Sequence, residues 1–360
     1  MKYIDEFRNH ELVQKLVGAI HKISRTPVRI MEVCGGHTMA IHRFGSHSLL
    51  PSNIELLSGP GCPVCVTSNT FIDRAIAISK LPDTVVTTYG DLIRVPGSYS
   101  SLEHEKANGA DIRIVYSALD AVEIARDNED KRVIFLGIGF ETTTPASAVA
   151  VMEAKRQKIG NFYLLSAHKT MPQAMMALID EGINIDAYIG PGHVSTIAGS
   201  DMYKPLLQKY NLSVVISGFE PVDLMQSILM LVKQSEQNKP SVEIQYKRVV
   251  KPGGNPKAME TLVEVFEYRD DWWRGFGIIP ASGMKLKEKY QQHDAEQMIR
   301  VTIEPTVESK GCICDKILKG LKTPVQCGLY NTSCTPSTPV GACMVSGEGA
   351  CAAFYKYAKR

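Results

Sequence analysis

Apolar residues recur at helical spacing near the start of the chain, within residues 5–23. Charged and polar residues separate them, as on an amphipathic helix with one buried face. The apolar positions are Phe7, Leu12, Val13, Leu16, Val17, Ile20 and Ile23. The pattern therefore predicts one helix that packs its apolar side against the rest of the protein.

From about residue 28 the pattern changes to short apolar runs, each followed by glycine or small polar residues and then by a helix-like stretch. Strands that alternate with helices in this way are typical of parallel sheets with right-handed crossovers. The runs lie at residues 29–33, 85–88, 112–116, 133–136, 162–165, 187–189 and 214–216. We therefore expect an α/β fold whose functional residues lie on loops at the carboxyl ends of strands.

A short internal repeat suggests how these strands are grouped. The tripeptide Gly-Pro-Gly occurs at residues 59–61 and again at residues 190–192, each time at an expected strand end. The first copy would place Cys62 where the second has His193. The hypothesis is two similar parallel-sheet α/β domains that face each other across a cleft, with thiols in one half and imidazoles in the other.

The strand pattern breaks after about residue 240, where turns and a helix around residues 256–268 precede a loop-rich, cysteine-rich end. Such an end is too poor in apolar runs for a large core, so a bound metal centre would supply part of its stability. The predicted division is an N-terminal helix packing on the other domains (1–25), α/β domain I (26–130), α/β domain II (131–243) and a smaller C-terminal domain (244–360).

Composition and charge exclude several classes of protein. The 360 residues are 44% hydrophobic and 22% charged, as in an ordinary globular protein. A net charge of +2 gives no electrostatic reason to expect binding to nucleic acid or to an anionic membrane. We find no apolar run of the roughly 20 residues that span a membrane, and no apolar secretory signal at Met1–Glu6. The expected location is the cytoplasm.

Nine cysteines form two tight groups with none between residues 66 and 311. Thiols that serve only in core packing would be scattered, whereas thiolates that bind a metal or carry out redox chemistry must gather. In a reducing compartment a set of structural disulfides is not expected. The groups are Cys34, Cys62 and Cys65, and then Cys312, Cys314, Cys327, Cys334, Cys343 and Cys351.

Four of the C-terminal cysteines are candidate ligands of an iron–sulfur cluster. Their uneven spacing matches neither the paired cysteines of zinc ribbons nor the run of bacterial ferredoxins. A 4Fe–4S cluster, a zinc site and uncoordinated thiols therefore remain open. The four candidates are Cys314, Cys327, Cys334 and Cys351, with Cys312 as a possible replacement for Cys314 and Cys343 interpreted as a small buried hydrophobe.

The N-terminal thiols suggest redox or metal chemistry in the cleft. Cys62 and Cys65 form a C-x-x-C element, which is typical of a reversible dithiol or of half a zinc site. Cys34 and His37 lie together on a glycine-rich turn. Polar residues at other expected strand ends, which could handle protons there, are Glu141, His168, His193 and Glu220.

Several of these segments, in this order, resemble the HypD family, the iron–sulfur maturation proteins of nickel–iron hydrogenases. The matching segments are residues 32–38, 59–65, 139–145, 190–195 and 347–351. The resemblance runs from the first helix to the last cysteine. It implies two similar α/β domains, a 4Fe–4S domain and a role as an assembly scaffold.

The resemblance also implies partners and a cargo. With the small chaperone HypC, family members hold the iron ion that becomes the Fe(CN)2CO half of the hydrogenase active site. HypE, which carries a thiocyanate made with HypF, donates the cyanide groups. Carried over by motif, Cys34 is the iron-holding thiol at the HypC interface, Cys62 and Cys65 are a redox pair or further iron ligands, and the cluster ligands are Cys314, Cys327, Cys334 and Cys351.

The mechanism that we expect is delivery of electrons from the cluster to Cys62 and Cys65, which act on an iron held by Cys34. His37, Thr38, Glu141 and His193 are expected to hydrogen-bond to the cyanide nitrogens or to handle protons in the cleft. This describes an assembly scaffold with redox activity rather than a free-standing enzyme. The alternative is a self-contained oxidoreductase acting on a small molecule, and the absence of a dinucleotide-binding fingerprint counts against it.

Overall fold

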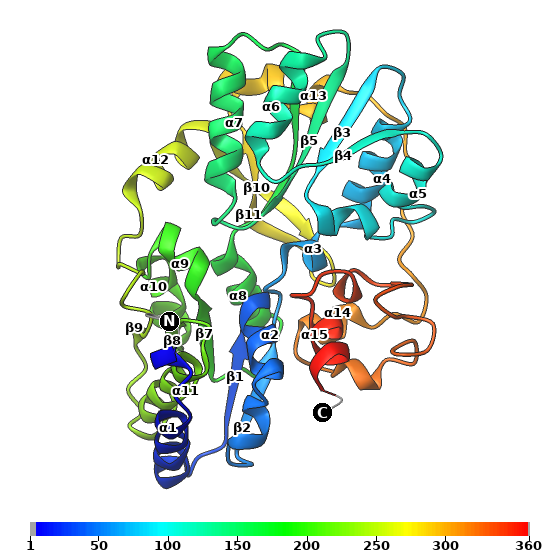
Figure 1. The fold of residues 1–360 in the computed structure, drawn as a ribbon. Helices are drawn as coiled ribbons and strands as arrows, with labels where there is room; N and C mark the ends of the chain where they lie inside the picture. Colours follow the sequence, from blue (N-terminus) through cyan, green and yellow to red (C-terminus); the bar gives the residue numbers. More distant parts are fainter. Residues whose placement is uncertain (1–4, 359–360) are drawn as a thin grey trace.

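The computed structural model describes residues 5–358, and Figure 1 shows their arrangement. Two parallel sheets form the body of the molecule, as the sequence predicted, so the α/β class is confirmed. The first sheet has the strand order β2-β1-β7-β8-β9. Its strands are β1 (Val28–Glu32), β2 (Ile54–Ser58), β7 (Ala187–Pro191), β8 (Ser213–Ser217) and β9 (Val242–Ile244).

The second sheet has the strand order β4-β3-β5-β6, and every neighbouring pair in it is parallel. Its central strands consist almost entirely of buried residues, which explains their unbroken apolar runs. The strands are β3 (Thr84–Thr88), β4 (Asp111–Ile114), β5 (Arg132–Gly139) and β6 (Phe162–His168).

The chain passes between the two sheets twice. It leaves the first sheet after β2, builds the whole second sheet, and returns to the first sheet at β7 beside β1. Each of the ranges 26–130 and 131–243 therefore contributes strands to both sheets. Both Gly-Pro-Gly turns end strands that flank β1, so they lie in one sheet and are not equivalent points of two domains.

Helices cover the sheets where apolar faces were expected. The predicted helix over residues 5–23 divides into a 3-10 turn (Asp5–Phe7) and α1 (His10–Ile23), because Asn9 caps the start of α1 by accepting the backbone N–H of Leu12. Val13, Val17 and Ile20 are buried in the core that α1 shares with α11. The other long helices are α2 (Gly35–Arg43), α4 (Asn69–Ser79), α6 (Ala118–Asp127), α7 (Thr144–Arg156), α8 (Met171–Asp180) and α11 (Pro221–Glu236).

The region after β9 forms two separate structures. Helix α12 (Pro256–Val265) and the antiparallel hairpin β10 (Phe266–Trp273) and β11 (Gly277–Leu286) add Phe266, Met284 and Leu286 to the core of the second sheet. The cysteine-rich unit that follows, residues 312–358, packs through α15 (Ala350–Tyr357) on α2 of the first sheet (Figure 1). No helix among residues 5–358 has the length and apolar character needed to cross a bilayer.

Candidate functional site

Cys34 lies at the carboxyl end of β1, as predicted, and caps the start of α2. The backbone N–H of Gly35 donates to the carbonyl oxygen of Gly61 at 3.0 Å, which ties this turn to the one after β2. A Cβ atom on Gly61 would lie 2.2 Å from the backbone nitrogen of Cys34. Glycine is therefore required at residue 61 so that the turns carrying Cys34 and Cys62 can cross.

Gly61→Ala should destabilise the protein, because the added methyl group meets backbone that cannot move aside. We expect a loss of about 3 kcal/mol in the free energy of unfolding, measured by urea denaturation. Gly253→Ala is the matched control, since a Cβ atom there meets nothing within 4 Å. Equal unfolding midpoints for the two variants would contradict the crossing that we describe.

The buried carboxylate of Glu32 stabilises the turn that carries Cys34. Its carboxylate accepts the backbone N–H of Cys34 at 3.0 Å and the hydroxyl of Thr38. Burial raises the pKa of Glu32 to about 8. Thr38 is itself buried and does not line the cleft. We therefore do not retain the prediction that Thr38 donates to a ligand there, and assign it to support of the turn.

His37 and His193 both stack on the aromatic ring of Phe219. Their ring centroids lie 4.6 Å and 4.1 Å from that of Phe219. His37 is fully buried, contacts the carbonyl oxygens of Ser217 and Gly218 through Nε2, and has its pKa lowered to about 4 by burial. His37 is thus a neutral structural residue, and we do not retain its predicted role as a donor. His193 does line the cleft, and burial lowers its pKa.

The predicted cleft exists and has a volume of about 700 Å³. It contains Cys34, Cys62 and His193, which the sequence had brought together from three strand ends. It also contains residues that sequence reasoning missed. These are Tyr89 and Asp91 after β3, Thr142 and Thr143 after β5, and Ser346, Gly347 and Glu348 from the cysteine-rich unit.

Glu348 brings a second carboxylate to the cleft beside Cys34. The turn at Gly35 packs so closely on it that a Cβ atom on Gly35 would lie 2.4 Å from the Cβ atom of Glu348. Burial, then Glu348 and Glu32, raise the pKa of Cys34 to about 12. An unliganded Cys34 therefore keeps its proton near neutral pH, and a cation bound there would favour the thiolate.

Cys62 and Cys65 occupy different environments although they are close in sequence. Cys62 lines the cleft at the start of α3 (Pro63–Val66), whereas Cys65 lies behind it with no exposed surface. A hydrogen bond with Cys62 and burial raise the pKa of Cys65. On its other side the Cys65 thiol contacts the carbonyl oxygen of Ala342, in the cysteine-rich unit, at 3.9 Å. Cys65 therefore lies between the cleft and that unit.

Glu141 does not line the cleft, contrary to the grouping expected from the sequence. Its Oε1 accepts the backbone N–H of Met171 at 3.1 Å, and its Oε2 is buried with no partner among the described residues. Burial raises the pKa of Glu141 to about 7. Its place at the start of α8 makes it a structural carboxyl group.

The raised pKa of Glu141 predicts a loss of stability as pH increases. The folded protein keeps the proton up to about pH 7, whereas the unfolded chain releases it near 4.5, so the free energy of unfolding falls between these values by roughly 3 kcal/mol. Glu141→Gln should remove this part of the pH dependence in urea unfolding at pH 5 and pH 8. Glu123→Gln, on an exposed site, is the control. A Glu141→Gln protein with an unchanged pH profile would contradict the assignment.

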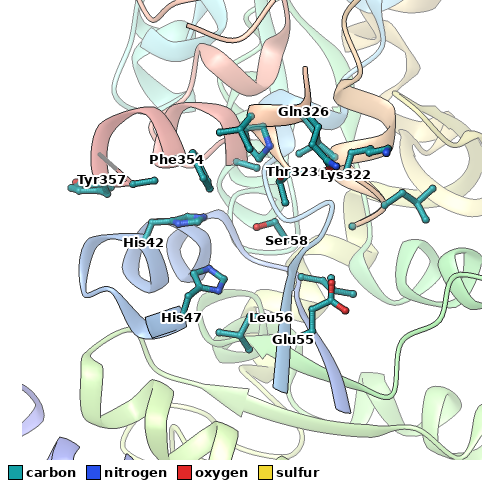
Figure 2. Close-up of a pocket in the computed structure, with 18 of the residues that line it drawn as sticks. His42, His47, Glu55, Leu56, Ser58, Lys322, Thr323, Gln326, Phe354 and Tyr357 are labelled. Carbon is teal, nitrogen blue, oxygen red and sulfur yellow. Dashed lines mark hydrogen bonds between the residues drawn. The ribbon is translucent and has the colours of Figure 1, made fainter. Parts of the chain in front are cut away.

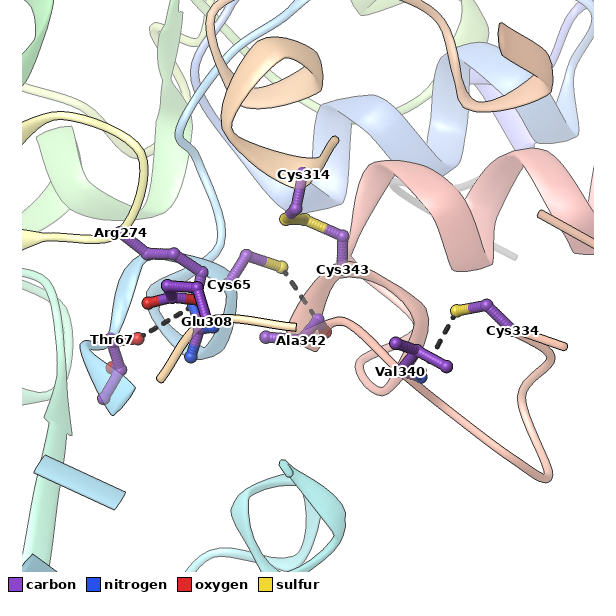
Figure 3. Close-up of a disulfide and its surroundings, with 9 residues drawn as sticks. All are labelled: Cys65, Thr67, Arg274, Glu308, Cys314, Cys334, Val340, Ala342 and Cys343. Atoms are coloured by element: carbon purple, nitrogen blue, oxygen red, sulfur yellow. Dashed lines mark hydrogen bonds and ion pairs between the residues drawn. A yellow bond between two sulfur atoms is a disulfide. The ribbon is translucent and has the colours of Figure 1, made fainter. Parts of the chain in front are cut away.

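The cysteine-rich unit contains a disulfide between Cys314 and Cys343, which the sequence had not predicted (Figure 3). The two sulfurs meet because helix α14 (Cys314–Leu318) and the 3-10 turn Ala342–Met344 form walls of the same cavity. Two expectations are therefore corrected. Cys314, predicted as a cluster ligand, is paired with Cys343 in this structure, and Cys343, interpreted as a small buried hydrophobe, is its disulfide partner.

The remaining four C-terminal cysteines surround that cavity. Cys312, Cys327, Cys334 and Cys351 are free thiols, and all four line it together with apolar residues such as Ile317 and Leu329. Burial and then the other three thiols raise the pKa of Cys351, so the four groups are close enough to interact. The alternative that the sequence left open, Cys312 in place of Cys314, is the one that this geometry supports.

The cavity has two further features that suit an inorganic sulfur cluster. The backbone N–H of Val340 donates to the sulfur of Cys334 at 3.3 Å, as N–H groups do around cluster thiolates. A Cβ atom on Gly341 would lie 2.7 Å from the sulfur of Cys312, so glycine leaves room at the sulfur. These observations fit a 4Fe–4S group held by the four free thiols.

Within residues 5–358 no three Cys, His, Asp or Glu side chains form a set that could hold one metal ion. A four-iron cluster makes a different demand, because each cysteine binds a separate iron at its own corner. The cavity provides four free thiols, one for each iron of such a cluster, in a largely apolar environment.

A larger groove, of about 960 Å³, lies between the cysteine-rich unit and the β2 edge of the first sheet and is shown in Figure 2. It is bounded by the edge strand β2, the end of α2 and residues 320–326, and no cysteine lines it. His42 packs on His47 and Phe354, and burial lowers its pKa to about 4. The groove thus holds none of the sulfur chemistry, which is concentrated in the cleft and the cluster cavity.

The fold and these sites define an α/β protein with a thiol-lined cleft joined by a buried dithiol to a cysteine-rich cavity. Residues 11–358 match the family model HypD, described as the hydrogenase formation hypA family. The chain belongs to the HypD family.

Curated relatives agree along the full length of the chain. Hydrogenase maturation factor HypD2 of Bradyrhizobium diazoefficiens is 46% identical, over 100% of this chain and 97% of its own. The HypD proteins of Rhodobacter capsulatus and Escherichia coli are 43% and 42% identical, each over 99% of this chain and 98% of their own. The resemblance noted from the sequence motifs is confirmed.

Proposed function

We propose that this protein is the scaffold on which the iron of a nickel–iron hydrogenase acquires its cyanide and carbonyl ligands. In this proposal the chain holds the iron with HypC and receives cyanide from HypE, which is itself supplied by HypF. The iron is the cargo of the reaction and not a resident cofactor. Membership in a family of hydrogenase maturation factors supports the proposal.

The observation that carries the proposal is the presence of two separate sulfur sites with Cys65 between them. Cys34 and Cys62 line the cleft, where a small cargo has about 700 Å³ of space. Four free thiols line the second cavity. Cys65 contacts Cys62 on one side and Ala342, next to the disulfide residue Cys343, on the other. A protein that only stored iron would not need a buried dithiol at this position.

In the cleft, we propose that Cys34 supplies the thiolate that holds the cargo iron. Soft thiolate ligands suit an iron that carries cyanide. His193 and Thr142 lie in the same cleft and can donate hydrogen bonds to ligand atoms. Glu348 can accept or release a proton beside Cys34.

The resident cofactor that we propose is a 4Fe–4S cluster held by Cys312, Cys327, Cys334 and Cys351. When bound, such a cluster supplies electrons one at a time. Cys62 and Cys65 as thiols can release two electrons and two protons and form one disulfide, which matches a two-electron reduction in the cleft. The Cys314–Cys343 disulfide can undergo the opposite reaction, in which it takes up two electrons and two protons and becomes two thiols.

The ligand assignment is tested by two cysteines that are two residues apart. Cys312→Ala should lose most of the iron and sulfide of anaerobically purified protein, because it removes a ligand. Cys314→Ala should retain both, because the sulfur it removes belongs to the disulfide. Iron and sulfide analysis with visible absorption measures both. Loss of the cluster in Cys314→Ala, with retention in Cys312→Ala, would restore the set predicted from the sequence.

A further inference from the structure

Arg274 is a buried cation that connects the β10–β11 hairpin to the segment after Cys65 and to Glu308, which precedes the cysteine-rich unit (Figure 3). It follows the last residue of β10, and its backbone N–H donates to the carbonyl oxygen of Val66 at 3.0 Å. Its Nε donates to the carbonyl oxygen of Thr67 at 3.1 Å. Both acceptors come directly after Cys65. The hairpin therefore places a fixed guanidinium beside the dithiol helix α3.

The same side chain lies beside the cysteine-rich unit. Nη1 of Arg274 donates to a carboxylate oxygen of Glu308 at 3.1 Å. Arg274 also lines a cavity of about 450 Å³ together with Cys312 and Cys314. The side chain of Glu308 is 51% exposed, so solvent screens its charge, whereas that of Arg274 is 9% exposed. The positive charge is thus better protected from water than its negative partner.

Part of the Arg274 hydrogen-bonding capacity is unused. Nη2 is buried and has no partner among residues 5–358. Burial lowers the pKa of Arg274, and Glu308, Cys65 and Cys312 act in the opposite direction, so these groups lie within its electrostatic reach. A buried guanidinium with a spare N–H group is expected next to a centre that carries negative charge.

We propose that Arg274 is a positioning residue that sets the reduction potential of the C-terminal iron–sulfur cluster by holding a buried positive charge beside its ligand Cys312 and beside Cys65. The inference rests on the proposed function. Reduction adds one negative charge to the cluster, and a nearby cation stabilises the reduced form. Arg274 therefore makes the cluster easier to reduce.

The test is a potentiometric titration, followed by electron paramagnetic resonance, of the full chain purified anaerobically with its cluster. Arg274→Gln should make reduction at least about tenfold less favourable, a potential lower by about 59 mV for one electron. Arg274→Lys keeps the charge and should stay near the wild-type potential. Glu308→Gln removes the negative charge that opposes Arg274. It should raise the reduction potential, by less than Arg274→Gln lowers it.

Arg94→Gln is the matched control for a structural effect. Arg94 also ties the cysteine-rich unit to the body, by donating to the carbonyl oxygens of Pro336 and Val345. Its loss should leave the potential unchanged. Equal potentials in wild-type and Arg274→Gln proteins, or equal shifts in Arg274→Gln and Arg94→Gln, would overturn the inference alone. A wild-type chain that binds no cluster would overturn the proposed function and this inference together.

Discussion

Cys34→Ala should remove the cyanide and carbonyl infrared bands from the complex that we propose this chain forms with HypC. Cys34 lines the cleft and is half-buried, so its sulfur can reach a bound cargo. The substitution deletes the proposed iron ligand and leaves the supports of the turn, Glu32 and Gly61, in place. We expect complete loss of the bands, measured by infrared spectroscopy of the co-purified complex.

Met39→Leu is the control, because Met39 lines the same cleft and leucine keeps its approximate volume. Both variants should retain the cluster, since Cys34 and Met39 lie outside the cluster cavity. Persistent cyanide and carbonyl bands in the Cys34→Ala complex would refute the role of Cys34 as the iron-holding thiol.

Replacing both Cys62 and Cys65 with alanine should stop hydrogenase maturation and leave the cluster content unchanged. Neither residue lines the cluster cavity, so iron and sulfide should equal those of the wild-type protein. The double variant removes the only dithiol that reaches from the cleft to the cysteine-rich unit among the described residues. Hydrogenase activity in cells that depend on the variant measures the effect, and we expect it to fall to background.

Cys314→Ala with Cys343→Ala provides a comparison, because it removes the neighbouring disulfide and keeps the Cys62–Cys65 pair. A partial loss of maturation there would indicate that the disulfide takes part in electron transfer. Active hydrogenase accumulating with the Cys62→Ala, Cys65→Ala protein would refute the dithiol mechanism.

The apolar pattern predicted seven of the nine parallel strands but not how they are grouped. Strand β2 was missed because it is an edge strand whose residues Glu55, Leu56 and Ser58 are only partly buried or exposed. The hairpin was missed because only the end residues of β10, Phe266 and Trp273, are buried, and the residues between them are mostly charged and exposed or partly exposed. A run of apolar residues indicates that a strand is buried and does not say which strand lies beside it. The double crossing between sheets could therefore not be predicted.

The site was predicted in outline, and the errors have physical causes. Strand ends correctly placed Cys34, Cys62 and His193 in one cleft. The same reasoning placed His37, Thr38 and Glu141 there, although their side chains are buried. His37 and Glu141 hydrogen-bond to backbone groups, and Thr38 donates to the carboxylate of Glu32. Cys312 and Cys314 are so close in sequence that spacing cannot choose between them. Only their positions relative to Cys343 and Cys351 do so.

The most direct test is Mössbauer spectroscopy of the iron-57-labelled complex with HypC, purified anaerobically. The two sulfur sites predict two kinds of iron in one sample. One is a four-iron component that disappears with Cys312→Ala, and the other is a single low-spin iron that disappears with Cys34→Ala. Zinc in place of the four-iron component, or one kind of iron that depends on both cysteines, would contradict the account.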